Sequence, residues 1–90
     1  MEIEYDPEKR LKTIALRGLD FEDAADVLQG PALTYQDERL DYGEVRWITV
    51  GLLRGRMVVV TWTQRGEAYR IISMRKANAK EQENYSERLG

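Results

Sequence analysis

The spacing of apolar and polar residues changes near residue 32, from a helical pattern before this point to a strand pattern after it. Residues 1–5 alternate apolar and charged side chains, which predicts a short edge strand. The segments 6–18 and 20–30 repeat their apolar residues at helical spacing and are expected to form two helices. The chain therefore begins with one short strand and two helices joined by almost no loop.

Capping residues mark the ends of both predicted helices. Asp6-Pro7-Glu8 supplies an N-cap carboxylate, a proline at the first helical position and an acid in the first turn, and Gly18 is a suitable stop. The apolar stripe of this helix consists of Leu11, Ile14 and Ala15. The second helix is expected to begin at Asp20 and to end at Gly30-Pro31. Its inward face consists of Phe21, Ala24, Ala25, Val27 and Leu28.

Four further strands are predicted after the change of period. Their ranges are 32–36, 44–53, 56–64 and 67–75. Arg54-Gly55 and Arg65-Gly66 are expected to be two-residue hairpin turns, because glycine tolerates the positive φ that such turns need. The last three strands then form an antiparallel meander, and three successive valines at 58–60 indicate that its middle strand is buried on both faces.

A final helix is predicted to begin at Asn78, because Asn78 and Glu81 have the spacing of a capping box. Its apolar side chains are few, which favours loose docking or a face that a partner completes. A chain of 90 residues is too short to divide into two domains with separate cores. We therefore expect residues 1–90 to be one α+β domain, with two N-terminal helices packed on one face of an antiparallel β-meander and a C-terminal helix after it.

Composition excludes several classes of chemistry. The chain has no cysteine and no histidine, so zinc, iron and copper sites lack their usual ligands, and Cys- or His-based nucleophilic catalysis is not expected. The lack of cysteine in so small a domain favours a reducing compartment, the cytoplasm. We expect no membrane span or signal segment. The sequence also has no Gly-rich phosphate-binding loop, which argues against a small-molecule enzyme. No cofactor or metal is predicted.

Acidic and basic residues are unevenly distributed along the chain. Residues 1–42 hold 5 Lys/Arg and 11 Asp/Glu, whereas residues 43–90 hold 9 Lys/Arg and 5 Asp/Glu. The basic second half would attract phosphates or an acidic protein partner. The alternative is an ordinary mixed surface, which the net charge of −2 also suits.

Several segments, in this order and spacing, resemble one known family. They are Tyr5-Asp6-Pro7-Glu8-Lys9, Gly18-Leu19-Asp20-Phe21-Glu22-Asp23-Ala24, Gly43-Glu44-Val45-Arg46-Trp47-Ile48-Thr49-Val50-Gly51 and Arg70-Ile71-Ile72-Ser73-Met74-Arg75-Lys76-Ala77. From Tyr5 to Tyr85 the chain is similar to the BrnT toxins of bacteria. The resemblance implies a RelE/ParE-like fold and a type II toxin that cleaves RNA without a metal and so inhibits translation.

The resemblance also implies partners. A BrnA-like ribbon-helix-helix antitoxin would bind the basic face of the toxin and block it. The complex would repress its own operon, so the chain would meet operator DNA only through the antitoxin. RNA is the implied substrate.

One pattern of the family is broken in this chain. BrnT relatives commonly carry Asn, two further residues and then Lys-His-Gly at the end of the first helix, and these positions are Thr13, Leu16, Arg17 and Gly18 here. Arg17 keeps a positive charge but does not exchange a proton near neutral pH. Two hypotheses therefore stand: an active ribonuclease, and a catalytically decayed domain that only binds its protein partner.

The predicted catalytic residues are Arg46, Arg70 and Glu44. Metal-free RNA cleavage needs positive charge at the pentavalent phosphate, and the guanidinium fork matches phosphate oxygens. Arg46 and Arg70 each interrupt an apolar strand pattern, and Glu44 falls on the same strand face as Arg46. The alternative is that these residues form structural ion pairs.

The predicted RNA-binding residues are basic or aromatic. They are Arg17, Arg65, Arg75, Lys76 and Tyr85. The basic residues at the end of the last strand are alternatively solvated charges, and Tyr85 alternatively packs against the sheet rather than contacting a base. Glu81 is interpreted as a helix cap rather than a general base. Trp47 and Trp62 are interpreted as core residues rather than as platforms for nucleotide stacking.

Overall fold

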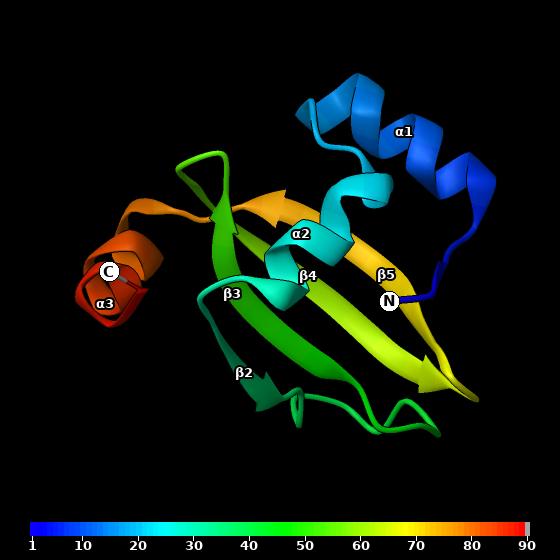
Figure 1. Ribbon diagram of the computed structural model, residues 1–90. Coiled ribbons are helices and arrows are strands. Elements are labelled where there is room, and N and C mark those ends of the chain that lie inside the picture. Colours follow the sequence, from blue (N-terminus) through cyan, green and yellow to red (C-terminus); the bar gives the residue numbers. More distant parts are fainter. Residues whose placement is uncertain (90) are drawn as a thin grey trace.

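A computed structural model describes residues 1–89, in which three α-helices surround one five-stranded sheet (Figure 1). The elements are β1 (Ile3–Glu4), α1 (Pro7–Arg17), the 3-10 helix η1 (Phe21–Asp23), α2 (Ala24–Gln29), β2 (Ala32–Gln36), β3 (Trp47–Leu53), β4 (Arg56–Arg65), β5 (Ala68–Lys76) and α3 (Ala79–Leu89). The predicted α+β class is confirmed. No helix among the described residues is long and apolar enough to cross a membrane.

The sheet is mixed, which corrects the wholly antiparallel arrangement expected from the sequence. Its strand order is β1-β5-β4-β3-β2. Strands β2 to β5 pair antiparallel, but β1 runs parallel to β5, with Ile3 opposite Tyr69 and Glu4 opposite Arg70. The alternating pattern of residues 1–5 predicts an edge strand but carries no information about the direction in which it pairs.

Two-residue turns connect β3 to β4 and β4 to β5. In the first turn Arg54 and Gly55 have φ of 50° and 81°, as a type I′ turn requires. In the second, Arg65 is still paired in the ladder, so the turn falls on Gly66-Glu67, one residue later than predicted. Gly66 supplies the positive φ, 60°, at the first turn position instead of the second.

Helices cover both faces of the sheet, whereas the sequence analysis placed them on one. Val58 and Val60 of β4 belong to the cluster under η1 and α2, and Met57 and Val59 belong to a second cluster that includes the end of α3. Alternate side chains of a strand point to opposite faces, so the prediction that β4 is buried on both sides is confirmed. The valine run shows that both faces are apolar, but not which helix covers each.

The two clusters differ in the elements that build them. The first consists of Leu19, Phe21, Ala24, Val27, Leu53, Val58, Val60, Ile71 and Met74. The second consists of Ile48, Val50, Met57, Val59, Ala77 and Leu89. Gly51 sets the close packing of α2 on the first face, because a Cβ at this position would lie 2.8 Å from Cγ1 of Val27.

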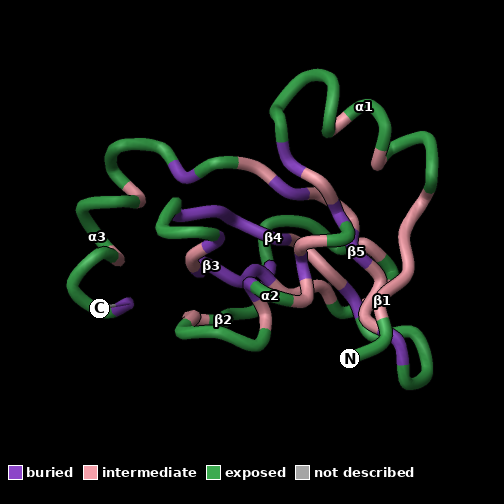
Figure 2. Tube along the Cα trace, turned by 45° about the horizontal axis from the view of Figure 1, so that its top comes forward, coloured by how far each residue is buried: buried purple, intermediate pink, exposed green. Residues whose placement is uncertain are grey.

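Helix α1 lies beyond the β5 edge, outside both packed layers (Figures 1 and 2). Its predicted ends are confirmed, since Asp6 accepts a hydrogen bond from the Glu8 N–H and Gly18 is left-handed with φ 67°. Its apolar stripe is nevertheless not buried. Leu11 is 63% exposed and Ile14 is 38% exposed, and none of the residues of α1 is buried.

Candidate functional site

Polar contacts hold α1 against the rest of the molecule. Arg10 forms a two-point ion pair with Asp20, with N···O distances of 2.7 and 2.9 Å. Lys9 and Arg17 donate hydrogen bonds, of 3.4 and 3.0 Å, to carbonyl oxygens on the outer edge of β5. Because β1 covers only the first part of this edge, these donors satisfy carbonyls that no strand pairs. The basic side of α1 therefore faces the sheet edge.

A shallow depression of about 260 Å³ lies between α1 and β5. Its walls are formed by Lys9, Lys12, Thr13, Leu16, Arg17, Phe21, Ile72 and Ser73. Thr13, Leu16 and Arg17 occupy the positions where the sequence departs from the family pattern, and all three lie on this wall. The fold thus gathers the departing positions at one surface site.

Basic side chains continue from this depression across the end of the sheet. Arg17 lines a second depression together with Arg75 and Lys76, and Lys76 lines a third together with Arg54 and Arg56. We call the continuous set the basic strip. It consists of Lys9, Lys12, Arg17, Arg54, Arg56, Arg75 and Lys76. Three of its members, Arg17, Arg75 and Lys76, are predicted RNA-binding residues.

Most of the basic strip is not neutralised by acids. Arg54 pairs with Asp23 at 3.4 Å and Arg75 pairs with Glu81 at 2.7 Å. The other five basic side chains form no ion pair with a carboxylate of residues 1–89. Such a surface attracts polyanions, because the positive charges repel one another less when phosphates lie between them.

Glu81 acts as a helix cap, as interpreted from the sequence. The Asn78 N–H donates to the Glu81 carboxylate at 2.9 Å, and the Glu81 N–H donates to the Asn78 side chain at 2.8 Å. Arg75 adds two hydrogen bonds to the same carboxylate. The Arg75 guanidinium, and then the Asn78 N–H, lower the pKa of Glu81 to about 2 despite its partial burial. The carboxylate therefore fixes both the start of α3 and the position of Arg75.

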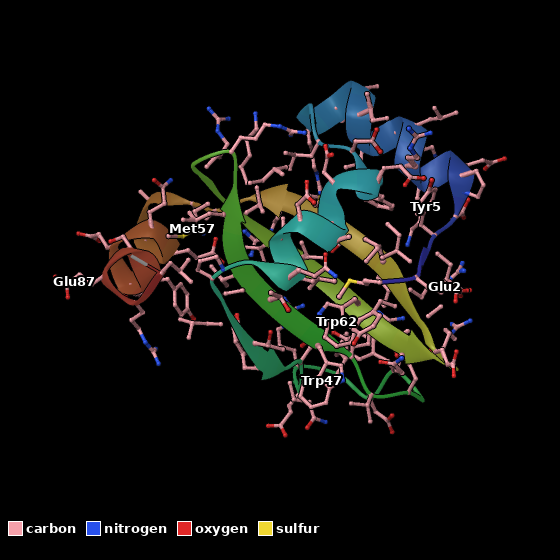
Figure 3. The ribbon with its side chains drawn as sticks, in the orientation of Figure 1. Glu2, Tyr5, Trp47, Met57, Trp62 and Glu87 are labelled. Atoms are coloured by element: carbon pink, nitrogen blue, oxygen red, sulfur yellow. The ribbon has the colours of Figure 1, made fainter. Side chains whose placement is uncertain are left out.

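Tyr85 lies half-buried on α3 and packs against the second core cluster. This packing matches the alternative considered for it, and its RNA contact stays a prediction. Trp62 likewise packs in the core: its indole N–H donates to Thr49 at 2.8 Å, and its ring lies 6.2 Å from that of Trp47 (Figure 3).

The predicted catalytic residues lie near the opposite end of β4 from the basic strip. Glu44 accepts hydrogen bonds from Arg46 at 3.1 Å and from Arg65 at 3.3 Å, and Arg70 pairs with Glu4 at 3.3 Å. We call these five residues the arginine cluster. Since β4 has 10 residues, Arg56 of the strip and Arg65 of the cluster lie roughly 30 Å apart along the strand, whereas Lys9 of the strip contacts Ile72, two residues from Arg70.

Each arginine of the cluster has an acidic partner. The hydrogen bond from Arg46, and then the charge of Arg65, lower the pKa of Glu44. The Arg46 guanidinium also lies over the Tyr42 ring, 4.1 Å from its centre. Tyr42 is held there because its hydroxyl donates to buried Asp37, which also accepts two side-chain hydrogen bonds from Arg39. The cluster thus consists of two preformed sets of ion pairs, one around Glu44 and one between Arg70 and Glu4.

Some strip residues were missed by sequence reasoning. From the sequence, Arg54 is predicted only as a turn residue and Arg56 only as the first residue of a strand, and Lys9 and Lys12 fall within the first predicted helix without an assigned role. The available signal was charge, since all four are basic. Nothing in the one-dimensional pattern indicated that the end of α1 lies beside the β3–β4 turn.

Among residues 1–89, no three His, Cys, Asp or Glu side chains are grouped to hold a metal ion.

The sequence matches the model of a known protein family. The family model described as the ribonuclease toxin BrnT of type II toxin–antitoxin systems matches residues 5–81. No curated protein matches the chain significantly. The matched range contains the whole basic strip and all of the arginine cluster except Glu4. The chain therefore belongs to the BrnT family of ribonuclease toxins of type II toxin–antitoxin systems.

Proposed function

We propose that this chain is an RNA-cleaving toxin that holds RNA phosphates along the basic strip. The observation that carries the proposal is the strip itself, seven basic side chains on one surface with five of them unpaired among the described residues. Membership of the BrnT family implies RNA as the target and an antitoxin as the partner. Sequence-independent phosphate contacts are the usual source of affinity for nucleic acids.

The depression shared by Arg17, Arg75 and Lys76, of about 490 Å³, is the most suitable place on the strip for a phosphodiester. Guanidinium and ammonium groups around a phosphate neutralise its charge and hold it in place. Arginine and lysine side chains do not ordinarily act as proton acceptors near pH 7. On the strip, positioning and charge neutralisation are therefore the available contributions to metal-free cleavage.

We further propose that cleavage takes place at the arginine cluster, on another phosphate of the same RNA, while the strip holds the RNA. An entering phosphate would replace Glu44 as the partner of Arg46, and Glu4 as the partner of Arg70. Glu44 is ionised at neutral pH, because its pKa is lowered, and a carboxylate released in this way can accept the 2′-hydroxyl proton as the 2′-oxygen bonds to phosphorus. The bond from phosphorus to the 5′-oxygen breaks in the same reaction, and water protonates this leaving oxygen. Support for this role comes from the network around Glu44, in which both basic partners are already within hydrogen-bond distance.

The test is cleavage of a labelled single-stranded RNA by the purified chain in EDTA. We expect the RNA to be cleaved and products that end in a 2′,3′-cyclic phosphate to accumulate. If the protein is folded and binds the RNA but does not cleave it in EDTA, the metal-independent mechanism is contradicted. Growth arrest after induced expression of the chain alone is the matching measurement in cells.

A decayed binding domain is the second candidate, and one observation favours it. Leu16 and Arg17 stand where the family commonly carries Lys and His, and both lie on the wall of the α1–β5 depression. If those groups are needed, Leu16→Lys/Arg17→His should raise the cleavage rate at least about tenfold, since general acid–base groups contribute roughly 100-fold or more. An inactive parent with an active double variant would establish the decayed state. Equal rates would favour the arginine-based mechanism.

The partner that we propose is a BrnA-like ribbon-helix-helix antitoxin in the cytoplasm. Family membership supports an antitoxin, and the resemblance stated from the sequence supports its class. A mobility-shift assay on the operon promoter tests the arrangement. The complex should bind the promoter, whereas the chain alone should bind it no better than unrelated DNA.

A further inference from the structure

Helix α1 carries exposed apolar side chains on its outer side, and most of the helix has the colour of exposed residues in Figure 2. Leu11 is 63% exposed, Ile14 is 38% exposed and Leu16 is 82% exposed, and Ala15 between them is also exposed. Residues three and four positions apart are neighbours on a helix surface, so Leu11, Ile14 and Ala15 form one patch. We call these three residues the α1 patch. The small side chain of Ala15 permits another helix to approach closely.

We infer that the α1 patch is the docking site for an acidic amphipathic helix of the antitoxin. This inference rests on the proposed function, because it takes the antitoxin as partner and the basic strip as the RNA site. The apolar side of the docked helix covers Leu11, Ile14 and Ala15. Its acidic side extends over Lys12 and Leu16 toward Arg17 and the rest of the strip, and so excludes RNA from the phosphate-binding depressions.

Charge on the helix selects an acidic occupant. Helix α1 contains Lys9, Arg10, Lys12 and Arg17 but only one acid, Glu8. Three charged side chains lie beside the α1 patch: exposed Glu8 is the one acid, Lys12 leads to the basic strip, and Arg10 is already neutralised by Asp20. Acidic side chains of the occupant are therefore attracted most strongly on the side that faces the basic strip. This attraction sets the rotation of the docked helix about its own axis.

A second copy of this chain fits the patch less well. Pairing two copies of α1 brings together two helices with an excess of basic residues. Helix α1 has 11 residues, so it is about 16 Å long, and two such helices bury far less than the roughly 800 Å² per partner of a stable interface. An occupant that covers both the patch and the strip buries more surface and neutralises more charge.

The experiment compares Leu11→Gln/Ile14→Gln with the parent chain and with a matched control, Leu40→Gln. Leu40 is 70% exposed and lies in the loop between β2 and β3, away from α1. Affinity is measured by calorimetry against the antitoxin expressed from the same operon. We expect the double variant to bind at least about tenfold more weakly and the control to bind like the parent. Lys12→Glu should weaken binding about threefold, and less so at high salt.

Parent-like affinity of the folded double variant would overturn the inference. The inference would also be overturned if the parent chain sedimented as a dimer and the double variant as a monomer, because the occupant of the patch would then be a second copy of the chain. RNA cleavage by the isolated double variant should equal that of the parent, since Leu11 and Ile14 lie outside the strip. If the parent cleaves no RNA and binding still depends on the patch, the proposed ribonuclease fails while this inference holds.

Discussion

The basic strip and the arginine cluster contain similar side chains but differ in how their charge is balanced. In the cluster, each of Arg46, Arg65 and Arg70 has a carboxylate within 3.3 Å. On the strip, two of seven basic side chains have an acidic partner and both of those arginines remain partly exposed. Arginines paired with acids hold strands and loops in place, whereas basic side chains without an acidic partner keep a net charge for an incoming anion, even where, like Arg17, they also donate to a backbone carbonyl. The strip is therefore suited to binding phosphates directly. The arginines of the cluster can contact a phosphate only after it replaces their acidic partners.

The largest effect is expected from Arg46→Ala/Arg70→Ala in the cluster. If these arginines stabilise the transition state, the double change should lower the single-turnover cleavage rate roughly several hundred-fold, as the loss of a charge-stabilising donor does. The affinity for RNA should stay within about twofold of the parent, because the strip is unchanged. Rates at saturating enzyme and filter-binding affinities measure the two quantities. An unchanged rate would leave these residues a structural role only.

Charge reversal on the strip comes next. Arg56→Glu/Lys76→Glu should raise the Kd for single-stranded RNA on the order of 50-fold, and it should reduce the slope of log K against log salt by about 1.4, since each phosphate contact on a single strand contributes roughly 0.7. Fluorescence titrations at several salt concentrations measure both. Lys80→Glu/Arg88→Glu, which makes the same charge change on exposed positions of α3, is the control. Equal losses in both variants would mean that net charge, not the strip, determines binding.

Glu44→Gln separates the two roles of that carboxylate. Removing its charge leaves Arg46 and Arg65 unneutralised, so RNA affinity should rise about threefold at low salt. If Glu44 also accepts the 2′-hydroxyl proton, the cleavage rate falls in the same variant. A rise in affinity with no loss of rate would assign Glu44 to neutralisation alone.

The smallest effect concerns the acid that positions Arg75. Folding lowers the pKa of Glu81 to about 2 from 4.5, so its ionised form stabilises the native state fully above about pH 4.5, and the contribution is lost as pH falls through about 2. Glu81→Gln should therefore lower the free energy of unfolding by about 1 kcal/mol at pH 7, the size of a helix-cap effect. Urea unfolding at pH 7 and pH 2 tests this, since the difference from the parent should be much smaller at the lower pH, where about half of the native Glu81 carboxyl groups are protonated.

Local features of the fold were predictable because they depend on a few adjacent residues. Asp6 caps α1, the pair Asn78 and Glu81 caps α3, and Arg54-Gly55 makes a tight turn, each as expected from its sequence. The burial of β4 on both faces also followed from sequence, because a run of valines leaves neither face polar. These features determine the α+β class and the order of elements.

Only the tertiary structure decided which residues meet at a surface. Arg17, Arg56 and Lys76 come from three segments far apart in the chain, and β-strand pairing together with the placement of α1 brings them side by side. The direction of β1 and the outward α1 patch were likewise set by packing. A periodic pattern states that a helix has an apolar side, but whether that side faces the core depends on which other surfaces compete for it. Here η1 and α2 occupy the sheet face, so α1 is left at the β5 edge with its polar side inward.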